Sequence, residues 1–591
     1  MTSGTPEVLS SPRSGDAYNA HSYHTKVPAG AIAALIERHL PHGGVVADPF
    51  CGSGSTGVAA AIAERALPAT GRYDVLLGDL SPYATFIAEG LNRAPNEETF
   101  ERSVRDCLDL ARREIGALWS TNHSDGRSGE IMYTVWSELL ICPRCRSSRR
   151  FWDQAVDLDE GAIRRTLVCP CGHEYRKNQA ERVTEQLFDP FIGESIERIV
   201  REPVVIAYEV DGERHEKAPD DDDLAVIGAA ARLTAPTVCP KRRMLNRTGP
   251  WGDLHRTGYH RGITHAHHFY TWRSFITLGH LWDAAAHTKT RDAVRLLISS
   301  YNLAHATLMS RLVFKRGNPR PVLTGYQTGA LYISSLPVEK NPLIGIERSK
   351  HRALTRAFSV VKGRRGKVDV MTAPAQDWRN LPVRIDYAFV DPPFGANIPY
   401  AEANFIAEAW LGRFTDQVAE ATMSKAQGKS ATDYRVLLAE GFDAIRHRLK
   451  RGGRMTVMFH SAASEPWNAL TGALCDAGFK TDGVLLLDKR QASFKQVRAK
   501  DAVEGDLLIE VRPRRTTTSR ARRRDTHLRT WLQNALDRKL VPLDAEAERR
   551  LFSRYVAEHV QRGARLNTSA SQFYSAARTV AAAFAESTPT G

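Results

Sequence analysis

The sequence predicts a doubly wound α/β fold whose parallel sheet is interrupted by a long insertion. Near the N-terminus, a short apolar strand, a glycine-rich loop, an alanine-rich helix and a second strand follow one another, which is the usual opening of such a sheet. Far downstream, further apolar strands resume the same alternation with helices. The predicted strands are 45–47, 73–77, 385–390, 455–459, 483–487 and 507–511.

Composition divides the chain into eight segments. A Ser-, Gly- and Pro-rich stretch opens the chain, and an Arg- and Thr-rich run precedes the last, helical part. An acidic run at 220–223 predicts a solvated loop within the insertion. The predicted segments are a flexible tail at 1–20, a first core part at 21–95, a helical connector at 96–130, a cysteine-rich ribbon at 131–180, an inserted region at 181–339, a second core part at 340–511, a basic linker at 512–530 and a helical C-terminal region at 531–591.

Length and charge restrict the class of protein. The 591 residues are too many for one hydrophobic core. A net charge of +14 favours a polyanionic partner such as nucleic acid, although basic proteins also carry such charge for solubility alone. Neither a secretory signal peptide nor an apolar run of about 18 residues is evident. We therefore expect a cytoplasmic protein that does not bind membranes.

The glycine-rich loop is a candidate cofactor site. Gly52, Gly54 and Gly57 form a G-x-G-x-x-G pattern, and Asp79 ends the next strand about 20 residues later. Glycines let the backbone approach a ligand, and an acidic strand end can accept hydrogen bonds from ribose hydroxyls. A dinucleotide site, an S-adenosylmethionine site and a structural tight turn all fit this pattern. Asp48-Pro49-Phe50, placed before the glycines, favours S-adenosylmethionine.

The segment Asp391-Pro392-Pro393-Phe394 decides between these interpretations, because no dehydrogenase requires it. The amine of a nucleobase is a poor nucleophile, and two acceptors aimed at its hydrogens make it more reactive. Asp391 can supply a carboxylate oxygen and Pro392 a backbone carbonyl, while the proline pair with Pro393 stiffens the turn. Phe394 offers a flat face for a base rotated out of its helix. A proline-rich turn at the end of a strand is the competing interpretation.

These motifs resemble the amino-directed DNA methyltransferases, which modify adenine N6 or cytosine N4. The resemblance is greatest to the adenine-specific DNA methylases that contain a zinc ribbon, and it covers most of residues 21–511. The matching stretches are His24-Thr25-Lys26-Val27-Pro28, the glycine-rich loop, Gly329-Ala330-Leu331-Tyr332-Ile333-Ser334-Ser335-Leu336, Asp391-Pro392-Pro393-Phe394-Gly395-Ala396-Asn397-Ile398-Pro399-Tyr400-Ala401-Glu402 and Ser493-Phe494-Lys495-Gln496.

The resemblance implies a class I S-adenosylmethionine-dependent methyltransferase sheet, with target recognition in the insertion. In this family, Asp79 would bind the ribose and Asp377 the adenine amine of the cofactor. The implied cofactor-binding residues are Thr25, Lys26, Asp48, Phe50, Gly52, Gly54, Asp79, Leu80 and Asp377, and the implied catalytic residues are Asp391, Pro392, Pro393 and Phe394.

The resemblance further implies methyl transfer from S-adenosylmethionine to adenine N6 in DNA. Three alternatives stay open: transfer to cytosine N4, transfer to an RNA base, and a DNA-binding subunit without enzymatic activity. Phe394 keeps RNA open, because some ribosomal-RNA guanine methylases also carry Phe there, whereas Tyr is commoner in the adenine enzymes. The implied partner is double-stranded DNA, with subunits of a restriction or phage-defence system as further candidates.

Two cysteine pairs predict a structural zinc site. Cys142 and Cys145 form a C-x-x-C knuckle, and Cys169 and Cys171 form a C-x-C pair that His173 follows. His173 is an alternative to Cys171 as the fourth ligand, and buried free thiols are the competing interpretation. A histidine-rich stretch at 255–268 is read as a polar segment in ordinary hydrogen bonds, with nucleic-acid contacts or a second metal site as alternatives.

Overall fold

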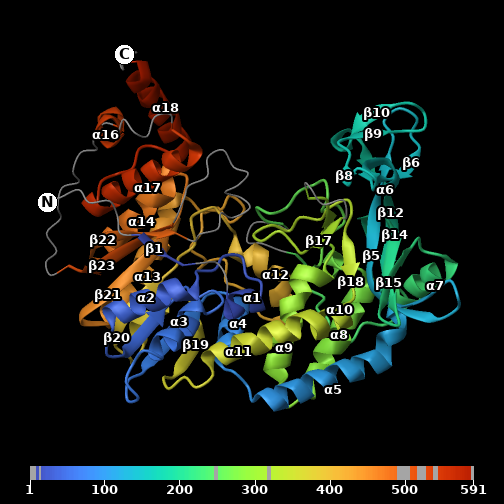
Figure 1. Cartoon of the computed structure of the whole chain (residues 1–591), viewed down its shortest axis with the longest axis horizontal. Helices are drawn as coiled ribbons and strands as arrows, with labels where there is room; N and C mark the ends of the chain where they lie inside the picture. Colours follow the sequence, from blue (N-terminus) through green and yellow to red (C-terminus); the bar gives the residue numbers. More distant parts are fainter. Residues whose placement is uncertain are drawn as a thin grey trace.

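A mixed eight-stranded sheet forms the framework of the part of the protein on the left of Figure 1. The computed structural model describes residues 8–11, 15–244, 251–315, 321–488, 506–514, 528–536 and 543–586. The strand order is β1 (Val8–Ser10), β22 (Phe479–Asp488), β23 (Asp506–Pro513), β21 (Leu449–Phe459), β20 (Ile385–Val390), β2 (Gly44–Asp48), β3 (Tyr73–Asp79) and β19 (Val368–Thr372). Only β23 runs antiparallel to its neighbours. The predicted α/β class with a mostly parallel sheet is confirmed.

Alternating side chains bury the sheet on both faces. Tyr387 and Phe389 of β20 pack on one face, and Ala388 and Val390 pack on the other. Period-two alternation between two apolar layers is expected of a sheet covered by helices on both sides. The first face is covered by α2 (Ala29–His39) and α3 (Ser55–Glu64), and the second by α13 (Ala431–Arg448), α14 (Ser464–Asp476), α16 (Leu528–Ala535), α17 (Ala545–Arg562) and α18 (Ala570–Glu586).

The chain reverses its winding direction at β2. From β2 it proceeds to β3 and β19 on one side, and it later returns to place β20 on the other side of β2. Ligands of open α/β sheets bind at such a switch point, outside the carboxyl ends of the strands. The glycine-rich loop follows β2 and Asp391 follows β20, so both motifs lie at this crevice.

The insertion forms a second sheet with its own helices. Its longest strands, β5 (Ser128–Ile141) and β14 (Arg201–Val210), pair in antiparallel fashion, and β18 (Val338–Lys340) pairs with β5. One hydrophobic core joins α5 (Glu97–Ile115), α8 (Trp272–Ala286) and α9 (Arg291–Tyr301) of the insertion to α4 (Pro82–Asn92), α11 (His351–Val361) and α12 (Tyr400–Leu411). The insertion therefore packs directly on helices next to the switch point.

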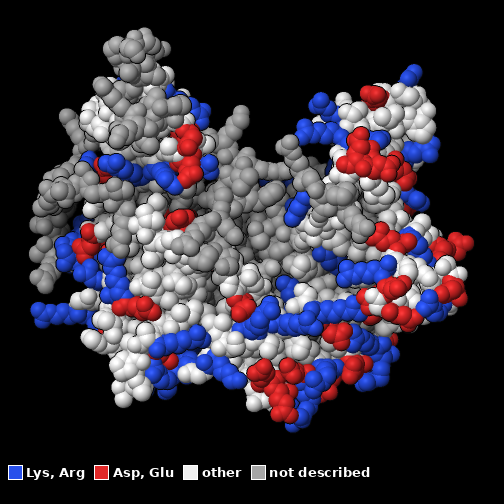
Figure 2. All heavy atoms as spheres, viewed as in Figure 1, with Lys and Arg blue, Asp and Glu red and all other residues white. Residues whose placement is uncertain are grey.

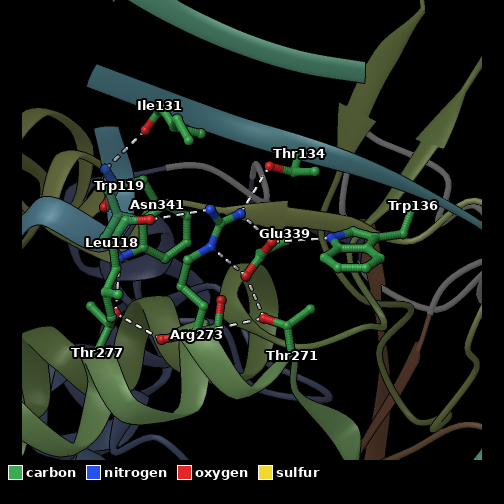
Figure 3. Close-up of polar contacts among 11 residues, drawn as sticks. Leu118, Trp119, Ile131, Thr134, Trp136, Thr271, Arg273, Thr277, Glu339 and Asn341 are labelled. Carbon is green, nitrogen blue, oxygen red and sulfur yellow. Dashed lines mark hydrogen bonds and ion pairs between the residues drawn. The ribbon is translucent and has the colours of Figure 1, made fainter. Parts of the chain in front are cut away.

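A buried ion pair holds the insertion's helices to its sheet (Figure 3). The Arg273 guanidinium on α8 contacts both carboxylate oxygens of Glu339 on β18, at 3.0 and 2.5 Å. It also donates to the hydroxyl of Thr134 on β5, and it lies over the Trp119 ring at 4.4 Å. Trp136 and Thr271 donate to the same Glu339 carboxylate. A buried pair with this many partners stabilises one relative position of α8, β5 and β18.

Several predicted boundaries differ from the structure. Residues 8–10 form an edge strand beside β22 and 16–20 form helix α1 (Asp16–Ala20), so the predicted loose tail is ordered there by pairing and packing. The predicted ribbon began at 131, but β5 continues unbroken to Ile141 because β14 pairs along it. The acidic run begins helix α7 (Asp221–Ala230), where Asp220 caps the first turn and the acidic side chains favour the positive end of the helix dipole. The predicted basic linker lies largely outside the described residues.

Across the described ranges, none of the helices combines the length and the apolar character needed to span a bilayer.

Candidate functional site

A cavity lies at the switch point between β2 and β20. Its walls come from the segment before α2, the glycine-rich loop, the end of β3, the turn before η6 (Ala375–Asn380), the start of the 391–402 segment and the loop between α12 and α13. The predicted site residues that line it are Thr25, Lys26, Asp48, Phe50, Gly52, Asp79, Leu80, Asp391 and Pro393. Segments far apart in the sequence are thus brought to one hollow.

Asp48 organises the glycine-rich loop. Its carboxylate accepts hydrogen bonds from the Phe50 backbone N–H at 3.1 Å and from the Thr56 hydroxyl at 2.5 Å. Burial raises the pKa of Asp48 to about 7. The carboxylate thus fixes the shape of the loop and the start of α3, which also line the cavity.

Asp79 bridges two loops that end adjacent strands. Its carboxylate accepts from the backbone N–H of Gly52 and of Ser81, both at 2.9 Å. Burial raises its pKa to about 6. Because Asp79 also lines the cavity, its carboxylate is placed to hold the glycine loop and to meet a ligand hydroxyl.

The two predicted loop glycines have different roles. Gly52 has φ of 49° and lines the cavity. Gly54 has φ of 80° and does not line it; a Cβ there would lie 2.8 Å from backbone and side-chain atoms of Ala88 on α4. Gly54 is therefore required for the close packing of α3 on α4. The expectation that it lines the cofactor cavity is not met.

The turn after β20 is held in place from α13. The Tyr434 hydroxyl donates a short hydrogen bond to the Pro393 carbonyl. Among the described residues none donates to the Pro392 carbonyl, which leaves that acceptor available. Phe394 is partly buried and packs edge to face on Phe459, with ring centroids 5.1 Å apart. Pro392 and Phe394 adjoin the cavity lining without belonging to it.

Asp377 lies outside the cavity. It is exposed on η6, whereas its neighbours Pro374, Ala375 and Gln376 line the wall. The turn that begins at Pro374 directs the Asp377 side chain away from the cavity, so position before β20 was a poor guide. Gln376 is the polar side chain of this turn that reaches the cavity.

Tyr23, Tyr400 and Glu420 also line the cavity, and none of them was among the predicted site residues. Tyr23 and Tyr400 stack with ring centroids 6.3 Å apart, and the Thr25 and Tyr400 hydroxyls lie 2.9 Å apart. Glu420 is buried and accepts from the Ala401 backbone N–H and from Gln427. Tyr400 could have been suspected from its place in the 391–402 stretch, but no sequence signal marks Glu420.

A hydrogen-bonded chain surrounds the cavity. Asn404 accepts from the His24 ring at 2.9 Å and donates to the Ser81 hydroxyl at 3.0 Å. Ser81 and Thr415 both donate to Glu408, at 2.6 and 2.5 Å. Burial raises the pKa of Glu408 to about 7. This chain connects the segment before α2, the end of β3, helix α12 and the loop that follows it.

The insertion also contacts the 391–402 segment. Glu402, at the end of the 391–402 stretch, accepts from the backbone N–H groups of Asp253 and Leu254, both at 2.8 Å. The Asp253 carboxylate in turn accepts from the Ser424 hydroxyl at 2.5 Å. Residues of the insertion thus buttress both helix α12 and the loop after it.

The four predicted cysteines converge at the distal end of β5. Their sulfur atoms all lie within 4.8 Å of one another, with Cys145 and Cys169 at 3.6 Å and Cys142 and Cys171 at 3.8 Å. Zinc–thiolate bonds of about 2.3 Å in a tetrahedron require sulfur separations of about 3.8 Å. His173 is not in this group and instead stacks on Tyr175. The four thiols are compatible with zinc.

Protein partners occupy most ring nitrogens at the end of the histidine-rich stretch, although the buried Nδ1 of His267 has none among the described residues. His267 and His268 both contact one Asp189 oxygen through Nε2, at 2.8 and 3.0 Å. The Nδ1 atom of His268 accepts backbone N–H bonds, so its Nε2 carries the proton and donates to Asp189. A metal ligand would need that nitrogen deprotonated. The interpretation as ordinary polar contacts therefore fits better than a second metal site.

Comparison with known proteins concerns the N-terminal part of the chain, which supplies the segment before α2 and the glycine-rich loop to the cavity. Residues 6–78, which contain β2, the glycine-rich loop and nearly all of β3, match the family model described as DNA methylase. No curated protein matches the chain.

Proposed function

This chain is related through its cofactor-loop region to the amino-directed DNA methylases, and from this premise we propose that it methylates adenine N6 in DNA. The observation that carries the proposal is the cavity itself. It places Asp391 opposite a loop region that matches the DNA methylase family, at the switch point of a mostly parallel sheet.

The polar and aromatic groups around the cavity suit the functional groups of S-adenosylmethionine. Asp79 would accept from the ribose hydroxyls, and Phe50 and Gln376 would face the adenine. Backbone N–H groups at the start of α3 would receive the amino-acid carboxylate, since a helix N-terminus favours negative charge. Left-handed Gly52 keeps the wall free of a Cβ at the point of approach. When bound, the cofactor supplies a methyl group made electrophilic by its sulfonium.

The protein's part in the reaction would fall to the turn after β20. Asp391 and the Pro392 carbonyl would accept hydrogen bonds from the target amine and orient its lone pair. The Asp391 carboxylate would also stabilise the positive charge that develops on the nitrogen. Tyr434 would keep the turn in position through the Pro393 carbonyl. The Phe394 ring, packed on Phe459, would present its remaining face to the flipped base.

We propose in addition a class I arrangement of the sheet and a structural zinc ion at the four cysteines. The single antiparallel strand, β23 between β21 and β22, and the switch point at β2 support the first. The sulfur separations support the second. All four ligand positions would be thiolates, which leaves no open position for a catalytic role.

Surface charge supports a nucleic-acid partner. Lys and Arg side chains form a band across the middle of one face, near α9 and α11 (Figure 2). The formal net charge is +14. Such a distribution attracts phosphate backbones and makes binding sensitive to salt.

The test compares Asp391→Ala with Asp369→Ala, which removes an exposed carboxylate on the sheet's edge strand β19. We expect Asp391→Ala to lower methyl transfer to DNA by about 10²–10³-fold while cofactor affinity is kept. Asp369→Ala should match the natural chain. Equal activity of all three proteins on DNA would overturn the catalytic assignment.

The target atom is decided by digesting methylated polymer to nucleosides. N6-methyl-2′-deoxyadenosine from DNA supports the proposal, whereas N4-methyl-2′-deoxycytidine would make cytosine N4 the target of the same chemistry. If the labelled methyl group of S-adenosylmethionine were transferred to RNA and not to DNA, the proposed substrate would be RNA.

A further inference from the structure

Four basic side chains interact with one another beside the cavity, and none has an acidic partner among the described residues. Lys26 lies before α2, Lys340 ends β18, Lys350 ends the π-turn η5 (Ile346–Lys350) and His305 lies in the π-turn η4 (Asn302–Ala306). We call these four residues the lysine cluster. All four are partly buried. Single π-turns within helices are frequent at functional sites.

The contacts of the lysine cluster are neutral or basic. The Lys26 ammonium donates to the carbonyls of Tyr18 and His21, and Lys340 Nζ lies 3.4 Å from His305 Nδ1. Within the described part of the chain, no carboxylate lies at ion-pair distance from Lys26, Lys340 or Lys350. Other lysines on this protein do form such pairs, among them Lys217, Lys362 and Lys450.

The arrangement is electrostatically unfavourable in the free protein. Burial, together with the charge of Lys350, lowers the pKa of Lys26 to about 7 and that of Lys340 to about 8. Burial, with Lys340 and Lys350, also lowers the pKa of His305 well below its usual range. Buried charges are normally paired. A cluster that repels itself and has no internal counter-ion would be stabilised by an anion from outside.

The lysine cluster is continuous with the proposed active site. Lys26 itself lines the cavity. The segment 325–329 spans the distance from the cluster to the catalytic stretch, because a Cβ at Gly325 would lie 3.5 Å from His305, and Gly329 donates its backbone N–H to His24. A Cβ at Gly329 would in turn lie 3.1 Å from Ile398, within the 391–402 stretch.

We propose that the lysine cluster binds a backbone phosphate of the DNA strand that carries the target base. This inference rests on the proposed function for the identity of the polymer. A phosphodiester carries the charge that the cluster lacks, and a strand whose base enters the cavity must hold a phosphate a short distance from it. The partial exposure of all four residues lets the rest of the strand stay in solvent. Such a contact would fix the strand's position without reading its sequence.

The test uses the full chain with Lys340→Met and Lys350→Met, and Lys362→Met as the matched control. Lys362 follows α11, is exposed and lies 3.4 Å from Glu97. Affinity for duplex DNA is measured at several NaCl concentrations. We expect each cluster variant to reduce the slope of log affinity against log salt by about 0.9, and the control to keep it. The KM for DNA should rise about tenfold in the cluster variants, with cofactor affinity unchanged. An unchanged salt slope in both variants would overturn the inference.

Stability distinguishes binding from a purely structural role. Because the free cluster repels itself, Lys350→Met should raise the Tm of the DNA-free protein or leave it unchanged. A lower Tm with an unchanged salt slope would assign the lysine to packing and contradict the proposal. Inorganic phosphate gives a second readout: stabilisation by phosphate that Lys350→Met abolishes, together with the altered DNA slope, supports the inference. Phosphate binding that Lys350→Met abolishes, with no change in the salt slope of DNA affinity, would reveal a site for a free anion only and contradict the inference.

These measurements stand apart from catalysis. DNA affinity is determined without methyl transfer, so a reduced salt slope in a protein that methylates no DNA would retain the phosphate site and refute the proposed activity. Full activity of the natural protein, together with an unchanged salt slope in the cluster variants, would retain the proposed activity and refute the phosphate site.

Discussion

At the scale of single residues, the two loop glycines separate stability from cofactor binding. In Gly54→Ala the added Cβ meets Ala88 of α4, and the residue must keep a left-handed φ. We expect a loss of about 2 kcal/mol or more in the free energy of unfolding. In Gly52→Ala the Cβ meets only the Tyr23 ring, at 3.2 Å, so stability should fall by about 1 kcal/mol. Urea unfolding without cofactor measures both.

Cofactor titration completes the comparison. The variant that loses less stability, Gly52→Ala, should lose more cofactor affinity. Gly52→Ala narrows the cavity wall and should weaken S-adenosylmethionine binding about tenfold or more. Folded Gly54→Ala should bind the cofactor nearly as well as the natural chain. Equal cofactor affinities in the two variants would contradict the separate roles assigned to these glycines.

Residues next to a strand end could be predicted from the sequence, and residues brought in by the fold could not. Asp48 and Asp79 end buried strands and Asp391 follows one, and parallel strands place their carboxyl ends at one edge. Glu420 reaches the cavity from a loop whose path depends on α12, α13 and the insertion. For Asp377 the sequence indicated the right turn, but one position along a tight turn changes which side chain faces the cavity.

At the scale of elements, the cysteine hairpins depend on the proposed zinc ion more than the rest of the chain does. Small hairpins with little core rarely fold without metal. Here β9 (Thr166–Val168) and β10 (Glu174–Arg176) pair with each other and with no other strand that the structure describes. We expect a strong chelator, or Cys142→Ser, to expose this region to protease and hydrogen exchange. The central sheet should keep its protection, because its core is separate from the hairpins' core.

Cys475→Ser is the matched control, because this thiol is exposed and lies on α14, away from the cluster. It should change neither the metal content nor the protease pattern. One bound zinc per chain in the natural protein, lost in Cys142→Ser, agrees with the assignment. Protection that is the same with and without chelator would show that the hairpins fold without metal.

Elements with strong local patterns were predicted closely. Strand β20 begins and ends where its apolar run does, at Ile385 and Val390. The limits of the ribbon were not, because β5 pairs with β14 along most of its length and with β6 and β11 at its end, and only these partners show where the ribbon begins. The start of α7 was missed because acidic side chains that suggest a solvated loop also cap helices.

At the scale of the whole molecule, the buried lysine cluster should make the free energy of unfolding depend on pH. Lys340 has a folded pKa of about 8, below the ordinary value of 10.5, because it is buried beside Lys350. Between these two pH values the unfolded chain binds more protons than the folded one, so this lysine's contribution to stability rises with pH. Below about pH 8 both states carry the charge, and the folded state bears its full cost.

Lys340→Met removes this titration, and its effect on stability should therefore change with pH. The variant should gain most over the natural chain at pH 7, and the gain should shrink between about pH 8 and 9.5 by at most about 1.4 kcal/mol per pH unit. Urea unfolding of both proteins at matched pH measures the difference, in which the other titrating groups cancel. Lys362→Met, which alters an exposed lysine, serves as the control at the same pH values. A gain for Lys340→Met that grows with pH would mean that this lysine is stabilised by a partner in the fold. The lysine cluster would then lack the uncompensated charge that calls for a phosphate.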